Sequence, residues 1–159
     1  MPLEIDIRDV INHVGRDLGA SGWVTVTQEQ INEFARVTGD NQWMHVDVER
    51  AGREMGGTIS HGLLIACLLP QLQHHLIEVT GFTGGYSYGF DKLRFTHPVR
   101  PGQRVRVRMT IDKVTPKDDD GRLVTLKCVM EIDGETRPAL VADYVALFYG
   151  ANQPSPVAP

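Results

Sequence analysis

The sequence predicts an α+β fold in which an antiparallel β-sheet wraps around one long central helix. The chain has 159 residues, which suits one domain with one substantial core. Residues 63–79 begin as a nearly unbroken apolar run, and a helix that is apolar all round is enclosed by the rest of its fold. Long alternating β-rich stretches follow, and a sheet with one apolar face can enclose a helix by curving round it.

The composition excludes several classes of protein. With 42% hydrophobic and 23% charged residues, the chain is typical of a globular protein rather than a disordered one. Its net charge of −4 gives no general attraction for nucleic acid, so we expect no nucleic-acid partner. The longest apolar run, residues 63–69, is too short to span a bilayer, so we expect no membrane partner. Cys67 and Cys128 lie in apolar sequence, which predicts buried free thiols and a cytoplasmic protein.

The elements of the N-terminal third are short. Asp6 can cap a short helix, residues 15–22 have the composition of a loop, and residues 23–26 are β-branched enough for a short strand. Thr27 opens a capping box, which predicts a helix that begins there. Gly39 is placed to end this helix in the left-handed conformation.

The rest of the chain is the predicted central helix and the sheet. Pro70 should kink the helix or break its hydrogen-bond ladder. Apolar and basic side chains alternate over residues 104–109, which predicts one buried and one wet face. We interpret residues 1–150 as a single domain and residues 151–159, which contain three prolines, as a disordered tail. The β-rich stretches cover residues 86–99, 103–115, 122–132 and 137–149, and hairpin-like connections between them predict a meander.

Candidate chemistry is concentrated near the two ends of the predicted loop between the helices. Asp40 and His45 follow the predicted end of the first helix and pair a carboxylate with an imidazole, the usual groups of acid–base catalysis. Gly62 is placed at the start of the central helix, where a backbone amide can stabilise developing negative charge. Ser60 is interpreted as the cap of that helix, and His61 as either a capping residue or a member of the site.

Structural interpretations of the same residues remain open. Asp40 alone could end a helix through an Asx-turn, and an isolated His45 is more often a hydrogen-bonded structural residue. His74 and His75 are adjacent, so they point to different faces of a helix and cannot chelate a metal as an i, i+4 pair would. The acidic residues 118–120 lack the later ligands of a calcium loop. We therefore expect no metal.

Taken together, these motifs resemble the MaoC-like hydratases, also called R-specific enoyl-CoA hydratases, and within them a subgroup similar to nodulation protein N. The chain departs from the family pattern where Gln42 and Trp43 replace the usual Asn and Pro. The residues that carry the resemblance are Phe34, Thr38, Gly39, Asp40 and His45, followed by the pair His61 and Gly62.

The resemblance implies a hot-dog fold and an activity. The implied reaction is reversible, syn hydration of a trans-2-enoyl-CoA to a (3R)-hydroxyacyl-CoA without a metal or organic cofactor. Asp40 and His45 take the acid and base roles in this scheme. The amide of Gly62 is carried over as the donor to the thioester carbonyl oxygen.

Further residues are candidates for holding the acyl-CoA substrate. Most of the basic residues that alternate along the strands are interpreted as the wet face of a sheet, and Lys92 and Arg94 are the candidates for contact with the phosphates of coenzyme A. Trp43 is either a packing residue or part of the acyl channel, and His61 is a candidate beside the site. A sheet with exposed edges hides one of them by pairing across a dimer, so we expect a homodimer.

Two other functions fit a fold of this kind. An acyl-CoA thioesterase would use a carboxylate to activate water against the thioester carbonyl. A non-catalytic hot-dog subunit would only bind an acyl thioester or a partner protein. The combination of Asp40 and His45 favours the hydratase over both alternatives.

Overall fold

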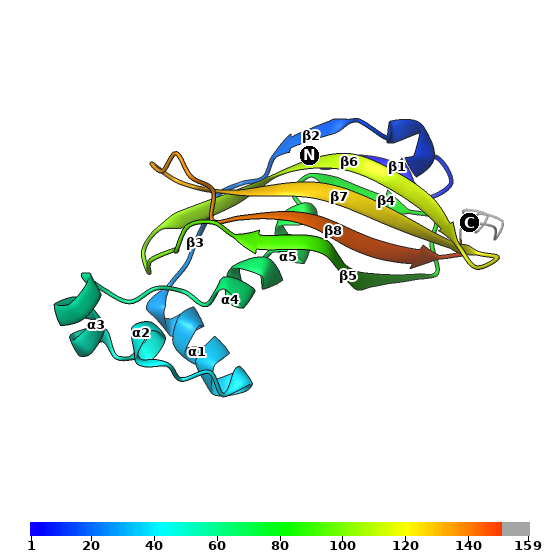
Figure 1. Ribbon diagram of the computed structural model, residues 1–159. Coiled ribbons are helices and arrows are strands. Elements are labelled where there is room, and N and C mark those ends of the chain that lie inside the picture. The colour runs from blue at the N-terminus through cyan, green and yellow to red at the C-terminus, as the bar shows by residue number, and fades with distance from the viewer. Residues whose placement is uncertain (151–159) are drawn as a thin grey trace.

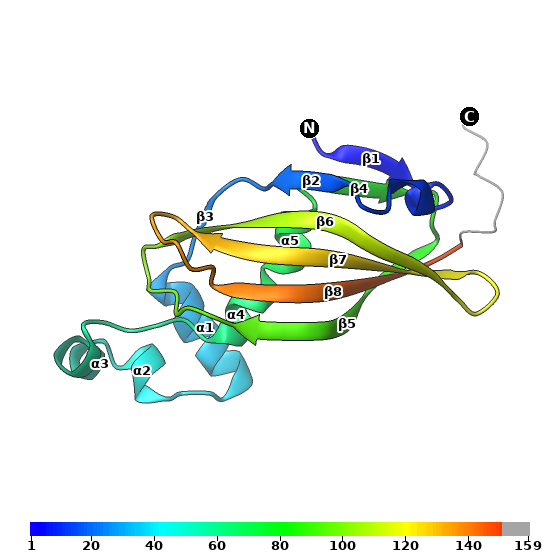
Figure 2. The same ribbon diagram turned by 45° about the horizontal axis from the view of Figure 1, so that its top comes forward.

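The structure is a computed structural model, and it describes residues 1–150 of the chain. The strands are β1 (Leu3–Asp6), β2 (Asp17–Ala20), β3 (Val24–Thr25), β4 (Ile77–Thr80), β5 (Gly84–Phe95), β6 (Arg104–Lys117), β7 (Gly121–Ile132) and β8 (Leu140–Tyr149). Within the described residues, a six-stranded antiparallel sheet has the order β2-β6-β7-β8-β5, and β3 also pairs with β6. The parallel pair of β1 and β4 lies beyond its β2 edge (Figure 2).

Helices cover one face of the sheet and one of its ends. They are α1 (Gln28–Thr38), α2 (Trp43–Val46), α3 (Val48–Met55), α4 (Gly62–Cys67) and α5 (Leu69–Gln73), with a 3₁₀ turn at Val10–His13. Figure 1 shows α4 and α5 against the face of the sheet, whereas α1, α2 and α3 lie together past the end of β5. Buried residues of α4, α5 and the sheet, among them Ile65, Leu69 and Met109, share one apolar cluster. The sheet wrapped around a helix is thus as the sequence predicts.

Several local predictions are confirmed. Thr27 accepts a hydrogen bond from the amide of Gln30, whose side chain bonds the Thr27 amide in return, so the capping box opens α1. Gly39 ends that helix with a φ of 79°, in the left-handed region that favours glycine. In β6, the apolar residues at 105, 107 and 109 are buried, whereas the arginines between them are more exposed.

The predicted central helix is too long. The helix breaks at Leu68, because Pro70 has no amide to donate, and the chain leaves it after Gln73. Residues 77–80 are instead β4, which pairs with β1, so the helix predicted near Asp6 is replaced by a strand and a later 3₁₀ turn. The loop predicted for residues 15–22 also contains a strand, β2, because its backbone pairs with the edge of β6.

The predicted meander is wrong at one connection. Strands β6, β7 and β8 follow one another as hairpins, but β5 pairs with β8 rather than with its sequence neighbour β6. The connection after β5 crosses the end of the sheet, where the amide of Thr96 bonds the carbonyl of Ala139 and the carbonyl of Val99 accepts from the amide of Ser60. These bonds hold the crossing segment against the start of α4 and prevent a hairpin.

The helix is also less enclosed than expected. Leu63 is 58% exposed and Cys67 is exposed, so one apolar side of α4 faces outward in the isolated chain. Cys128 is buried as predicted, and desolvation raises the pKa of its thiol to about 12. The prediction of a buried Cys67 is therefore wrong for the single chain. The tail predicted for residues 151–159 lies outside the described residues.

Candidate active site

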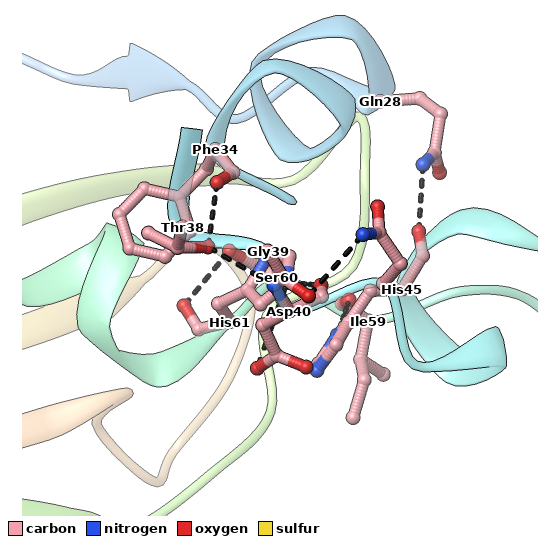
Figure 3. A network of polar contacts seen from close by, with 10 residues as sticks. Gln28, Phe34, Thr38, Gly39, Asp40, His45, Ile59, Ser60 and His61 are labelled. Carbon is pink, nitrogen blue, oxygen red and sulfur yellow. Dashed lines mark hydrogen bonds and ion pairs between the residues drawn. The ribbon is translucent and has the colours of Figure 1, made fainter. Parts of the chain in front are cut away.

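Asp40 occupies the point where the chain leaves α1. The left-handed Gly39 turns the backbone out of the helix, and the hydroxyl of Thr38 donates to the carbonyl of Phe34 in the last turn (Figure 3). The Asp40 amide donates weakly to that same hydroxyl, at 3.4 Å. These contacts set the direction in which the carboxylate leaves the backbone, and its side chain remains 42% exposed.

His45 lies on the short helix α2 and is held at both its ring and its backbone. Its Nδ1 lies 2.8 Å from the carbonyl oxygen of Ile59, and because a carbonyl can only accept, Nδ1 carries the proton. The His45 carbonyl in turn accepts from Nε2 of Gln28, also at 2.8 Å. This tautomer leaves the Nε2 lone pair free to take a proton.

His61 is the residue before α4 and is almost fully buried, at 3% exposure. Its Nε2 lies 2.9 Å from the backbone carbonyl oxygen of Asp40, and its ring stacks on that of His45 with centroids 3.8 Å apart. Figure 3 shows the side chains of Asp40, His45 and His61 gathered between the end of α1 and the start of α4. Three segments of the sequence are thereby joined at one place.

The spacing of these groups suits a shared water molecule. Asp40, His45 and His61 each offer an atom within 4.8 Å of the others. Two groups that hold one water between them stand about 4.5 Å apart, because each hydrogen bond is about 2.8 Å long and the two meet at a near-tetrahedral angle. The carboxylate and the imidazole can therefore act on the same water.

The same cluster fits a metal ion poorly. A metal draws nitrogen ligands to about 2.1 Å along directions that lie in each ring plane and converge. The rings of His45 and His61 are stacked with only 29° between their planes, so their lone pairs lie in nearly parallel planes that do not converge readily on one ion. Nε2 of His61, the ring nitrogen that lies 3.9 Å from the Asp40 carboxylate, already donates its proton to the Asp40 carbonyl and has no lone pair for a metal. The arrangement favours acid–base chemistry over chelation.

Gly62 supplies the backbone amide at the start of α4. As the first residue of the helix, its amide precedes the helix's own hydrogen-bond ladder and points out of the N-terminus. Ser60, predicted to cap this helix, does not: the residue in the cap position is His61, and the Ser60 hydroxyl donates to the His61 carbonyl instead. The reason is that the helix begins one residue later than a Ser60 cap requires.

A cavity of about 330 Å³ joins the helix start to the imidazole. His45, Gly62 and Ile65 line it from the helical side, and Phe95 and His97 line it from the segment that follows β5. From the sequence, Phe95 is predicted to be a packing residue, and no role is predicted for His97. The signal that was available is their place at the end of a strand, where loops held by a rigid scaffold often carry function.

The remaining candidates lie away from this cavity. The ring of Trp43 packs under Arg50, whose guanidinium carbon is 4.3 Å from the ring centroid. Lys92 and Arg94 line a separate cavity of about 210 Å³, beside Lys127 and Asp143. Contact of Lys92 and Arg94 with the phosphates of coenzyme A stays a prediction, as does a place for Trp43 in the acyl channel.

Comparison with known proteins identifies the family. The sequence model of one protein family, described as the MaoC like domain, matches residues 9–131. The chain is 39% identical over 143 residues to 3-hydroxyacyl-thioester dehydratase Z of Mycobacterium tuberculosis (strain ATCC 25618 / H37Rv), covering 89% of this chain and 95% of that protein. It is 37% identical over 147 residues to nodulation protein N of Rhizobium leguminosarum bv. viciae, covering 91% of each.

A solved structure shows the same fold. The (R)-hydratase from A. caviae involved in PHA biosynthesis superposes with a TM-score of 0.63 at 21% identity, covering 84% of this chain and 94% of that one. Among the helices of the described residues, none has the length and apolar character needed to cross a bilayer. The family model and the mycobacterial relative match most of the chain, and the solved structure has the same architecture. The chain therefore belongs to the MaoC-like dehydratase family and has its hot-dog fold.

Proposed function

We propose that the protein hydrates trans-2-enoyl-CoA thioesters to (3R)-3-hydroxyacyl-CoA thioesters, and catalyses the reverse dehydration. The observation that carries this proposal is the convergence of three groups. His45 and Gly62 line one cavity, and a carboxylate oxygen of Asp40 is within 4.8 Å of a His45 ring nitrogen. The name of the mycobacterial relative, a 3-hydroxyacyl-thioester dehydratase, and that of the (R)-hydratase support the reaction class and its hand.

Asp40 and His45 perform the proton transfers as a pair. One water between them loses a proton to the pair as its oxygen bonds to C3 of the enoyl group. The pair returns a proton to C2 from the same side, so the addition is syn and both groups end as they began. The free Nε2 of His45 supports a role as proton acceptor.

The amide of Gly62 stabilises the enolate oxygen that forms on the thioester. A backbone N–H at a helix start is oriented before the reaction and needs no rearrangement, and one such donor contributes about 3 kcal/mol to the transition state. Substrate and water supply every atom of the product, so this scheme uses no metal and no organic cofactor.

We further propose that the protein acts as a homodimer in the cytoplasm. Within the described residues, β5 forms one edge of the sheet and carries exposed aromatic side chains at Tyr86, Tyr88 and Phe90. Pairing of β5 with the β5 of a second copy would satisfy its outward backbone groups and cover these rings. Free thiols at Cys67 and Cys128 support a reducing compartment.

A crotonyl-CoA assay tests the proposal. We expect loss of the enoyl absorbance without release of free thiol, and chiral analysis should identify the product as the (3R)-hydroxyacyl thioester. Release of free coenzyme A at the same rate would instead identify a thioesterase. Absence of both reactions over a series of enoyl chain lengths would leave a binding subunit and contradict the proposal.

A further inference from the structure

His61 contacts both proposed catalytic residues but does not line the cavity beside His45 and Gly62. Its ring is 3% exposed, and the cavity is walled by its neighbours Ser60 and Gly62 rather than by its side chain. Asp40 does not line this cavity either, but its side chain is 42% exposed, whereas the buried ring of His61 offers almost no surface to a substrate. Any effect of His61 on the reaction must therefore pass through Asp40 or His45.

The contact with Asp40 is a tether. The backbone carbonyl of Asp40 lies just beyond the left-handed turn at Gly39, where no helical hydrogen bond holds the chain. His61 Nε2 donates to that carbonyl at 2.9 Å, and the same nitrogen is 3.9 Å from Oδ2 of the carboxylate. Because a carbonyl only accepts, the proton of His61 is on Nε2. This bond ties the start of α4 to the exit from α1.

The contact with His45 is a stack. The two ring centroids are 3.8 Å apart, and the ring of Phe34 supports His61 from 5.0 Å. The bond from His45 Nδ1 to Ile59 fixes one edge of the catalytic ring, and the stack fixes its plane. Two constraints of different kind thus set the direction of His45 Nε2.

An imidazole at position 61 is unfavourable for the stability of the fold. Within the described residues, the buried Nδ1 of His61 has no hydrogen-bond partner. A buried acceptor without a partner is unfavourable for folding, and a hydrocarbon ring of the same size would fill the space without that unfavourable contribution. The imidazole is therefore explained by what its other nitrogen does, which is to hold Asp40.

We infer that His61 is a positioning residue, which holds Asp40 by its Nε2 and the plane of His45 by its ring so that the two act on one water. The inference rests on the proposed hydratase function. Displacement of a catalytic group by about 1 Å lowers turnover by up to about 100-fold without weakening substrate binding. His61 should therefore affect kcat and leave KM unchanged.

Two variants separate the tether from the stack. His61→Phe keeps a ring and loses the donor, whereas His61→Gln keeps an N–H donor and loses the ring. Each should lower the kcat of crotonyl-CoA hydration about 10- to 100-fold with KM unchanged. In a His45→Gln background, no imidazole remains at position 45 for His61 to orient. There the additional decrease in kcat caused by His61→Gln should be smaller than in the wild type, whereas the additional decrease caused by His61→Phe should be as large as in the wild type. His74→Gln, at an exposed histidine, is the matched control.

Nuclear magnetic resonance of the histidine nitrogens gives a readout that does not depend on activity. We expect the proton of His61 on Nε2 and that of His45 on Nδ1, and the His45 resonances should move in both His61 variants. Normal kcat per folded enzyme in both variants, a raised KM alone, or a proton of His61 on Nδ1 would overturn the inference. Wild-type protein without hydratase turnover would overturn the proposed function itself, so the two failures are distinguishable.

Discussion

The phenyl ring of Phe95 lies against the α-carbon of Gly62, at the start of α4. A Cβ added at position 62 would come within 2.8 Å of two carbons of that ring, closer than real side chains approach. Glycine at this position therefore allows the end of β5 to pack directly on the helix N-terminus. The contact also sets one wall of the cavity beside the amide proposed to stabilise the enolate.

This packing predicts a specific loss of stability. Gly62→Ala should lower the free energy of unfolding by about 1–3 kcal/mol, because the added methyl group displaces the Phe95 ring. Phe95→Ala removes the obstacle, so the double variant should be more stable than the sum of the single changes implies. Urea unfolding of the four proteins measures the coupling. Purely additive effects would mean that the ring moves aside without difficulty.

The same pair allows a clean test of the Gly62 amide. In a Phe95→Ala background, Gly62→Pro lacks the N–H donor, whereas Gly62→Ala retains it. Proline is tolerated at the first position of a helix, and His61 already has the extended backbone, with φ −60° and ψ 135°, that precedes a proline. We expect kcat about 10²- to 10³-fold lower for the proline protein than for the alanine protein. Equal turnover would exclude the amide as the oxyanion donor.

Removal of either acid–base group should stop the chemistry and leave the fold intact. Asp40→Asn and His45→Gln each keep the size of the side chain, and each should lower kcat about 10²- to 10⁴-fold. Asp91→Asn, at an exposed aspartate on β5, and His74→Gln are the matched controls. Circular dichroism and unfolding curves should match those of the wild type. Near-normal turnover in both site variants would remove the assignment.

The sequence predicts those parts of the fold that have a local cause. The capping box at Thr27 and the left-handed Gly39 depend on residues within one helical turn, and both are as expected. The pairing of β5 with β8 depends on contacts across 45 or more positions in the chain, as between Phe95 and Leu140, and no local pattern specifies it. The end of the central helix depends similarly on a partner strand, β1.

The candidate site divides in the same way. Asp40 and His45 are separated by one short loop, so the sequence could propose them together. The positions of Lys92 and Arg94 could not be predicted, because β5 has register shifts between residues 87 and 89 and between 90 and 92. Each shift reverses which face the following side chains occupy. The stack of His61 on His45 likewise joins elements that only the folded chain brings together.

Gln28 is expected to support the site from α1. Its Nε2 donates to the carbonyl of His45 at 2.8 Å, and its Oε1 accepts from the buried hydroxyl of Thr58. Gln28→Ala removes both bonds, so we expect kcat to fall about tenfold and unfolding to need about 1–2 kcal/mol less. Asn32→Ala, which removes the exposed partner of the same amide group, is the control. Unchanged kcat in Gln28→Ala would show that His45 is held in place without Gln28.

The exposed edge of β5 predicts how the oligomer can be broken. Tyr88 is 54% exposed on this strand, and Tyr88→Lys would place a charge in a β5–β5 interface. Val37 is 74% exposed and lies on α1 rather than on β5, so Val37→Lys adds the same charge to a different element. Sedimentation should give a dimer for the wild type and Val37→Lys, and a monomer for Tyr88→Lys. The monomer should also lose turnover, because Phe95 ends the same strand and walls the cavity beside Gly62. A dimeric, active Tyr88→Lys protein would mean that the copies associate through another surface.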